Sequence, residues 1–312
     1  MENLNTCGYC SNQSATMPGC TRCKKIRYCT VDCQTNHWPT HKPNCIQSTN
    51  PSVIFVWKQA FRNKPATALG NFWGIGDMLR GIATTFDVCK KLGINFYVDM
   101  RYHPISTFFR KKDHPFMTLV DAHINDINFV GLSSDAQMTT FISSNKDAPQ
   151  LFCTNGFICD SYSESAKLFI KDMLSPNAEL DKFIKENTPL TPYTILHFRL
   201  GDRQLFNHQQ FKFDGIMPFF IKHADSSSIL LSDSPQFKKF IIQNYPTYKT
   251  YDHSIAHIGN SKDLIALKNT LFEFLLASAA SHIKTYSVYE WSSGFIDSIK
   301  KIYDVAVTDI RP

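Results

Sequence analysis

The 312-residue sequence lacks several features that mark large classes of proteins. It has no run of about 18 consecutive apolar residues, the length that a membrane-spanning helix requires, and no apolar stretch of signal-peptide type near its N-terminus. It also contains no internal repeat and no low-complexity tract. We therefore expect a globular protein that stays inside the cell, in the cytoplasm or nucleus, without secretion and without a membrane partner.

The chain also has only a small excess of positive over negative charge. The formal net charge is +6, and charged residues make up 19% of the chain, against 43% hydrophobic residues. Nucleic-acid binding usually depends on a dense basic face, which this small and mixed excess does not supply, so we expect no nucleic-acid partner. The hydrophobic share is ordinary for a globular protein with a sizeable core, and the length allows two or more domains.

Cysteine is abundant only at the N-terminus, where seven of the ten cysteines lie within 45 residues. With one histidine they follow the pattern C-x2-C-x9-C-x2-C-x5-C-x3-C-x7-H-x3-C. Interleaved CxxC pairs are typical of zinc sites, whereas a disulfide framework would spread its cysteines more evenly. Eight ligands complete two tetrahedral sites with no open position, so both predicted zinc ions are structural. The ligands are Cys7, Cys10, Cys20, Cys23, Cys29, Cys33, His41 and Cys45.

The ligand spacing and the stretch CQTNHWPTHKPNC resemble the MYND zinc finger over residues 7–45. So small a unit has almost no core, and metal binding would supply its folding free energy. In that family the two sites are cross-braced. The resemblance implies one zinc on Cys7, Cys10, Cys29 and Cys33 and another on Cys20, Cys23, His41 and Cys45.

The resemblance also implies a protein partner, because MYND fingers mostly bind peptides, often proline-rich ones. Gln34 and Trp38 occupy the positions that usually line the peptide groove. A tryptophan ring packs against prolines and an amide pairs with a peptide carbonyl, which suits an extended proline-rich ligand. The alternative is that Trp38 merely covers the small core of the finger.

After a polar linker at 46–52, apolar runs alternate with helical patterns. Repeated strand–helix order predicts an α/β fold with parallel sheets covered by helices. We divide the chain into a finger at 1–48 and two Rossmann-like domains at 53–175 and 190–305. Predicted strands lie at 53–57, 94–98, 127–130, 150–153, 193–199, 229–232 and 282–286. Predicted helices lie at 78–92, 133–143, 163–174, 178–186, 215–224, 235–244, 262–281 and 290–303.

Two segments at strand–helix junctions suit a phosphate ligand, since ligands collect at the carboxyl ends of parallel strands. Gly74-Ile75-Gly76-Asp77 opens a predicted helix, where glycines admit a ligand to the backbone and free N–H groups favour an anion. A plain tight turn is the alternative. His197-Phe198-Arg199-Leu200-Gly201-Asp202 leaves a predicted strand with His197 and Arg199 on one face, and a guanidinium suits a diphosphate. The alternative is a structural salt bridge between Arg199 and Asp202.

Hydroxyl-rich segments mark two further junctions. Ser232, Asp233 and Ser234 follow an apolar strand, and Ser292-Ser293-Gly294 precedes the last predicted helix. Such groups can bind a ribose, a base edge or phosphate oxygens. The alternative is that they are helix caps, and Ser234 before Pro235 fits that pattern well.

Taken in order over about residues 70–305, these motifs resemble the fucosyltransferase-type GT-B glycosyltransferases, which bind GDP-fucose, need no metal and invert the anomeric centre. The resemblance implies that Arg199 holds the β-phosphate, with His197 beside it. It implies phosphate contacts for the Gly74–Asp77 and Ser292–Gly294 segments and nucleoside contacts for Ser232, Asp233 and Ser234. A fixed arginine and backbone dipoles would stabilise the departing diphosphate.

The sequence departs from that pattern in two respects. Leu200 stands where several relatives have a second arginine, and no general base is evident among Asp202, Asp77, Glu290 and Asp160. The alternative function is therefore an inactive glycosyltransferase-like adaptor whose finger binds proteins. A methyltransferase is disfavoured, because Asn207-His208 does not continue as the NHS motif of SET enzymes and GxGD is not GxGxxG.

Overall fold

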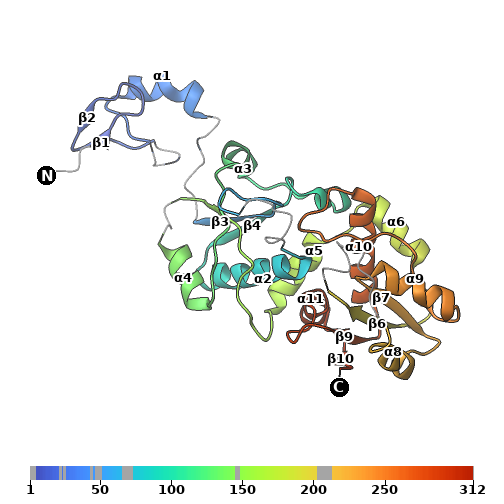
Figure 1. Ribbon diagram of the computed structural model, residues 1–312. Helices are drawn as coiled ribbons and strands as arrows, with labels where there is room; N and C mark the ends of the chain where they lie inside the picture. Colours follow the sequence, from blue (N-terminus) through green and yellow to red (C-terminus); the bar gives the residue numbers. More distant parts are fainter. Residues whose placement is uncertain are drawn as a thin grey trace.

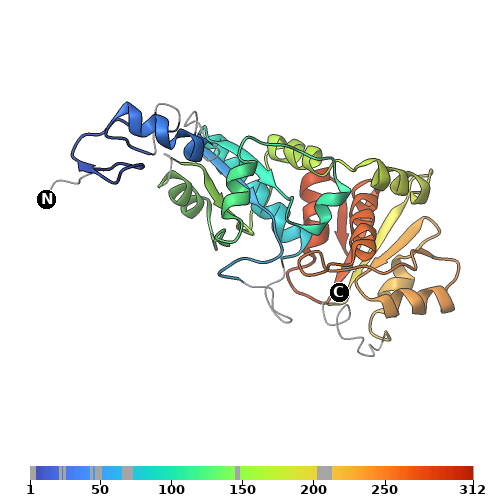
Figure 2. The ribbon, with the colours of Figure 1, turned by 90° about the horizontal axis from the view of Figure 1, so that it is seen from above.

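The computed structural model describes residues 5–20, 23, 26–42, 45, 51–64, 73–144, 148–201 and 213–311. A small N-terminal unit lies at one end of the molecule, and two helix-covered sheets follow it (Figures 1 and 2). Asp202, a predicted catalytic residue, lies outside the described residues. No helix within these ranges has the length and apolar character needed to cross a membrane.

The N-terminal unit has very little regular structure. Two short antiparallel strands, β1 (Asn5–Thr6) and β2 (Gln13–Ser14), precede helix α1 (Val31–His41), which Thr30 caps by accepting a hydrogen bond from the Cys33 amide. Its core is built largely from the predicted zinc ligands. The buried residues of this core are Cys7, Met17, Cys20, Cys23, Tyr28 and Cys45.

The first sheet has the parallel order β4–β3–β5, formed by Asn95–Asp99, Ser52–Val56 and Gln150–Phe152. All five residues of β3 are buried, which matches its continuous apolar run and is typical of a parallel strand covered on both faces. The helices of this half are α2 (Ile75–Lys91), α3 (Met117–His123), α4 (Asp135–Ser143) and α5 (Glu164–Met173). The short helix η2 (Pro104–Phe108) and helix α6 (Ala178–Asn187) both contact α10 (Leu264–Ser278) of the second half.

The second sheet is also parallel, in the order β10–β9–β6–β7–β8. The chain starts in the centre at β6, winds outward through β7 and β8, and returns to the other side for β9 and β10. The strand order therefore reverses between β6 and β9, and such a switch point is where doubly wound sheets bind ligands. The strands are Thr194–Arg199, Ser228–Ser232, Lys249–Thr250, His282–Ser287 and Val307–Asp309, and the helices are α8 (Met217–His223), α9 (Pro235–Asn244), α10 (Leu264–Ser278) and α11 (Gly294–Tyr303).

Helices α2 and α11 join the two halves, and their N-termini lie against each other. A Cβ atom placed on Gly76 would come within 2.2 Å of the Gly294 carbonyl oxygen, and Ser298 donates a hydrogen bond to the Gly76 carbonyl at 3.3 Å. The largest buried apolar cluster contains residues from both sheets. The predicted domain boundaries at 53–175 and 190–305 stay a prediction.

The predicted α/β fold with parallel sheets behind a zinc-type finger is confirmed. The strand predicted at 127–130 is wrong, because this segment makes only a single bridge, from Phe129 to Cys153. Helix α2 begins at Ile75, three residues before the predicted start, so Gly76 and Asp77 belong to its first turn. The sequence pattern also missed η2, α3, β8 and β10, which are too short for a periodic signal to develop.

Gly81 provides a test of this packing. A Cβ atom there would lie 1.9 Å from the Thr154 carbonyl oxygen that follows β5. We expect Gly81→Ala to lower the free energy of unfolding by about 1–3 kcal/mol, despite the better helix propensity of alanine. Gly131→Ala, where a Cβ would meet nothing within 4 Å, is the matched control in urea unfolding. Equal stability of the two variants would contradict this packing.

Candidate functional site

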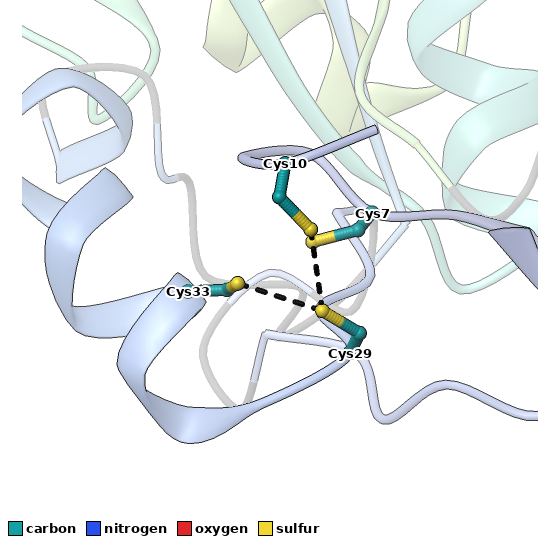
Figure 3. Close-up of side chains that lie close together, drawn as sticks. All are labelled: Cys7, Cys10, Cys29 and Cys33. Atoms are coloured by element: carbon teal, nitrogen blue, oxygen red, sulfur yellow. Dashed lines mark hydrogen bonds between the residues drawn. The ribbon is translucent and has the colours of Figure 1, made fainter. Parts of the chain in front are cut away.

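The first set of predicted zinc ligands converges on one point. The thiols of Cys7, Cys10, Cys29 and Cys33 point toward one another (Figure 3), and their sulfur atoms all lie within 4.8 Å of each other. The Cys10–Cys29 and Cys29–Cys33 sulfur separations are 3.3 and 3.5 Å. Four sulfurs around a zinc ion at about 2.3 Å would be about 3.8 Å apart, so this set fits a tetrahedral zinc site.

The second set converges in the same way and is fully buried. The Cys20 and Cys45 sulfurs are 3.6 Å apart, and the Cys23 sulfur lies 3.4 Å from His41 Nε2. One imidazole nitrogen and three cysteine sulfurs also suit zinc. The two sets are interleaved along the chain, as the cross-braced arrangement requires.

Both predicted peptide-binding residues lie beside the second set of ligands. The Gln34 amide is 4.0 Å from the Cys20 sulfur, and the Trp38 ring packs edge-on against His41 at a centroid distance of 5.8 Å. Each side chain is only partly buried. Trp38 therefore covers the finger's core on one side and keeps surface that a ligand can contact.

Zinc removal tests the assignment. We expect a chelator to unfold residues 7–45, because the buried core of this unit consists mainly of ligand thiols. Amide hydrogen exchange should then rise in the finger while β3, β6 and β9 keep their protection. Readdition of zinc should restore the finger. Unchanged exchange across 7–45 after complete zinc removal would contradict a metal-dependent fold.

A cavity of about 780 Å³ opens at the carboxyl ends of β6, β7 and β9, and both halves of the chain line it. Ten of the predicted site residues lie in its wall. They are Gly74, Gly76, Asp77, His197, Arg199, Ser232, Asp233, Ser292, Ser293 and Gly294. Ser234 is buried outside this lining, where it caps α9 by accepting from the Phe237 amide at 3.2 Å. The helix-cap alternative therefore describes Ser234.

Arg199 is held from two sides. Its Nη1 donates to Asp233 Oδ2 at 2.6 Å, and its guanidinium lies over the Tyr289 ring at 5.7 Å from the centroid. The Asp233 carboxylate also accepts from the backbone amides of Leu200 and Gly201, at 2.6 and 2.9 Å. Asp233 thus fixes the end of β6. The sequence did not indicate this role, because the only ion-pair partner considered for Arg199 was Asp202.

His197 is a neutral group at the floor of the cavity. Its Nδ1 lies 3.0 Å from the Thr285 hydroxyl, and its ring stacks on Phe295 at 6.0 Å. Burial lowers the pKa of His197 to about 3, and the nearby Arg199 charge acts in the same direction. At neutral pH this histidine contributes a hydrogen-bonding nitrogen and no positive charge.

Two helix N-termini open into the cavity without a side-chain cap. Gly74 precedes α2 and Ser293 precedes α11, and neither side chain caps its helix. The Ser292 and Ser293 hydroxyls make no hydrogen bond to another described residue. Free N–H groups at such ends favour an anion. Every other described helix of eight or more residues has a side-chain cap, from Thr30, Ser134, Ser163, Asn177, Ser234 or Asp263.

The remaining charged groups of the wall are paired. Asp77 accepts from Arg80 at 2.9 Å, and Asp297 accepts from Lys301 at 2.8 Å. Glu273 accepts from Lys238 at 2.6 Å. Burial alone would raise the pKa of Glu273, but Lys238 and His253 more than offset that effect, so the net shift is downward.

Several of these wall residues escaped sequence analysis. Asp297 and Lys301 carry an i, i+4 spacing on the last predicted helix that could have revealed them, whereas nothing local marks Glu273, Tyr289 or Trp291. Two of the candidate general bases, Glu290 and Asp160, are not part of the described lining.

The neutral state of His197 makes the free energy of unfolding depend on pH. The folded pKa of about 3 is below the unfolded value of 6.5, so this group stabilises the fold fully above pH 6.5 and progressively less as the pH falls toward 3. Between about pH 7.5 and 5 the expected loss is about 2 kcal/mol. Urea unfolding of His197→Asn should show correspondingly less loss than wild type, since shared effects cancel. An equal loss in both proteins would contradict a buried neutral His197.

Comparison with known proteins identifies relatives of the N-terminal finger. A family model of the MYND finger matches residues 7–45. Human N-lysine methyltransferase SMYD2 is 41% identical over 54 residues, which cover 17% of this chain and 12% of that protein. Zebrafish Tudor domain-containing protein 1 is 39% identical over 73 residues, 23% of this chain and 6% of that protein. The chain thus matches only a small part of either relative's length.

The remainder is similar to solved fucosyltransferases. Fucosyltransferase NodZ from Bradyrhizobium has a TM-score of 0.50 and 14% identity, covering 81% of this chain and 93% of that one. The apo form of POFUT1 has a TM-score of 0.43 and 9% identity, covering 84% and 99%. At this identity the NodZ likeness shows the fold alone. Residues 7–45 are therefore a MYND finger with two zinc-binding sites, and the chain that follows has a glycosyltransferase-like fold of GT-B type.

Proposed function

We propose that the protein transfers a sugar from a nucleotide donor, with GDP-fucose as the donor and inversion at the anomeric carbon. The observation that carries the proposal is the meeting of two uncapped helix N-termini with Arg199 in one cavity. Positive ends of helix dipoles and a guanidinium together form a site for a doubly charged diphosphate. The choice of GDP-fucose rests on the motif resemblance.

The diphosphate would be held by fixed groups. The first amides of α2 and α11 donate to its oxygens, the Ser292 and Ser293 hydroxyls add two donors, and Arg199 binds the β-phosphate. Asp233 and Tyr289 already orient Arg199, so little reorganisation is needed on binding. Neutral His197 donates or accepts a hydrogen bond without changing the charge of the site.

In the transfer step, an acceptor hydroxyl oxygen forms a bond to C1 of the sugar as the bond from C1 to the β-phosphate oxygen breaks. GDP leaves with the electron pair, and the preorganised donors stabilise the charge that develops on it. The acceptor proton passes to a carboxylate of the wall. Asp77 and Asp297, with 36% and 43% of their side chains exposed, are more accessible for this role than Asp233 and Glu273, at 8% and 7%.

The MYND finger would bring a protein to the transferase. Trp38 and Gln34 present partly exposed surface beside the second zinc site, and an extended proline-rich segment suits such a ring and amide. The proposal places the protein in the cytoplasm or nucleus, where the zinc-binding thiols stay reduced.

A second candidate function is a nucleotide-binding adaptor without catalysis. It is favoured by one observation: within the described lining, each of the four carboxylates of the cavity wall is paired with a cation. A carboxylate that is already paired is a weaker base than a free one. This candidate shares the diphosphate site and differs only in turnover.

Nucleotide binding by Arg199 variants tests the proposal. We expect GDP to raise the melting temperature of the zinc-loaded protein, because it binds the folded state alone. Arg199→Lys should weaken GDP binding at least about tenfold, since lysine keeps the charge opposite Asp233 but loses the planar fork. Arg199→Ala should weaken it further.

Arg62→Ala is the matched control, because this arginine is 72% exposed and lies outside the cavity lining. GDP affinity that is equal in all four proteins would exclude the diphosphate site. GDP binding without release of free fucose or fucosylated product from GDP-fucose, over a range of acceptors, would favour the adaptor.

A further inference from the structure

Two large apolar side chains line the cavity and yet are mostly exposed to solvent. Trp291, in the β9–α11 connection, is 77% exposed, and Ile158, in the β5–α5 connection, is 84% exposed. They come from the two halves of the chain. An isolated exposed apolar residue is ordinary, but two that belong to the wall of one polar cavity indicate a surface for a ligand.

Trp291 is held in place before any ligand binds. Its ring stacks on Tyr289, with centroids 4.9 Å apart and planes 15° apart, and Tyr289 in turn lies over Arg199. Arg311 donates hydrogen bonds to the carbonyls of Tyr289 and Glu290. Ser292 has a φ of 68°, a left-handed conformation that costs energy for a serine and that recurs at binding sites. The connection thus presents a fixed aromatic face.

The wall of the same cavity also carries two carboxylate–cation pairs. Asp77 with Arg80 on α2, and Asp297 with Lys301 on α11, line the same cavity. A carboxylate has about four acceptor positions, so one paired cation leaves room to accept hydrogen bonds from hydroxyl groups. The two cations offer donors to hydroxyl oxygens beside them.

An aromatic face beside paired carboxylates and cations matches the chemistry of a saccharide. A pyranose ring has an apolar C–H face that packs on the negative face of an aromatic ring, and an edge of hydroxyls that both donate and accept. A peptide would need unpaired backbone groups or an apolar groove, and the described wall offers Ile158 and Trp291 as its exposed apolar groups.

We propose that Tyr289 and Trp291, with the Asp77 and Asp297 carboxylates, form an acceptor subsite that binds a saccharide ring on the face of Trp291. The inference rests on the proposed transferase function, because it assigns the second substrate of the same cavity. Arg199 and the helix N-termini hold the donor diphosphate, and the exposed rim receives the acceptor from solvent. Trp291 reaches the donor site only through Tyr289, and Asp233 still holds Arg199 when Trp291 is replaced.

Fluorescence of Trp291 tests the proposal on the zinc-loaded full chain saturated with GDP. Of the other three tryptophans, Trp57 is buried, Trp73 stacks on Phe129 and Trp38 in the finger is partly exposed. All three are present in both wild type and Trp291→Phe, so the difference in acrylamide quenching between these two proteins reports mainly on Trp291. Lactose, cellobiose, maltose and N,N′-diacetylchitobiose are the probes. We expect at least one to reduce the quenching of Trp291 by about twofold or more.

Affinities from calorimetry then separate the roles. Trp291→Ala should bind the active disaccharide at least about tenfold more weakly, and Trp291→Phe less than about threefold, because phenylalanine keeps an aromatic face. GDP affinity should be unchanged in both. Leu190→Ala, at a fully exposed position outside the cavity lining, is the control for loss of an apolar surface group.

Three outcomes would overturn the subsite: no disaccharide protects Trp291, the active disaccharide binds Trp291→Ala as well as wild type, or Trp291→Ala loses GDP affinity and so belongs to the nucleotide site. Each leaves the GDP response of wild type intact. Failure of the proposed transferase function would instead appear as no GDP binding by wild type, or as GDP binding without turnover of GDP-fucose.

Discussion

The backbone contact between Gly76 and Gly294 is the constraint on which the cavity depends. It places the N-termini of α2 and α11 side by side, although 218 positions separate the two glycines in the sequence. Two positive helix ends repel each other, and in most helices a side-chain cap and acidic residues reduce that cost. Here the caps are missing, and Asp77 and Asp297 in the first turns provide partial compensation. An anion bound between the two helix ends would offset the rest of the repulsion.

The topology of the second sheet adds the remaining groups at the same place. Because the strand order reverses between β6 and β9, the connections that follow these two strands diverge and leave a crevice at their carboxyl ends. Arg199 leaves β6 there, and Tyr289 to Ser293 leave β9. Asp233, from the end of β7, then fixes Arg199 by accepting from its guanidinium and from two backbone amides. The arginine is thus oriented by its own sheet.

Local sequence patterns predicted much of this arrangement. Buried parallel strands are often continuous apolar runs, which made β3 and β7 recognisable, and cysteine spacing identified both zinc sites. What the sequence could not supply were partners distant along the chain. The Arg199–Asp233 pair spans 34 positions, and the steric need for glycine at Gly76 arises from Gly294. Trp291 carries no local pattern, because an aromatic residue in a connection is usually a core residue and its 77% exposure appears only in three dimensions.

The finger and the transferase-like fold are stabilised by different interactions. The finger owes its structure to metal, since its buried core is made chiefly of zinc ligands, whereas the two sheets share a large apolar cluster. Loss of zinc and loss of the proposed nucleotide site are therefore expected to be separable events. A partner recruited by the finger would raise the local concentration of an acceptor near the cavity without altering the cavity.

The central claim is that the two helix ends and Arg199 recognise a diphosphate. Its most direct test is calorimetric titration of the zinc-loaded full chain with GDP, guanosine and inorganic pyrophosphate. The account predicts that GDP binds at least about a hundredfold more tightly than guanosine and that pyrophosphate competes with GDP. Equal binding of GDP and guanosine, or no binding of either GDP or pyrophosphate, would contradict it.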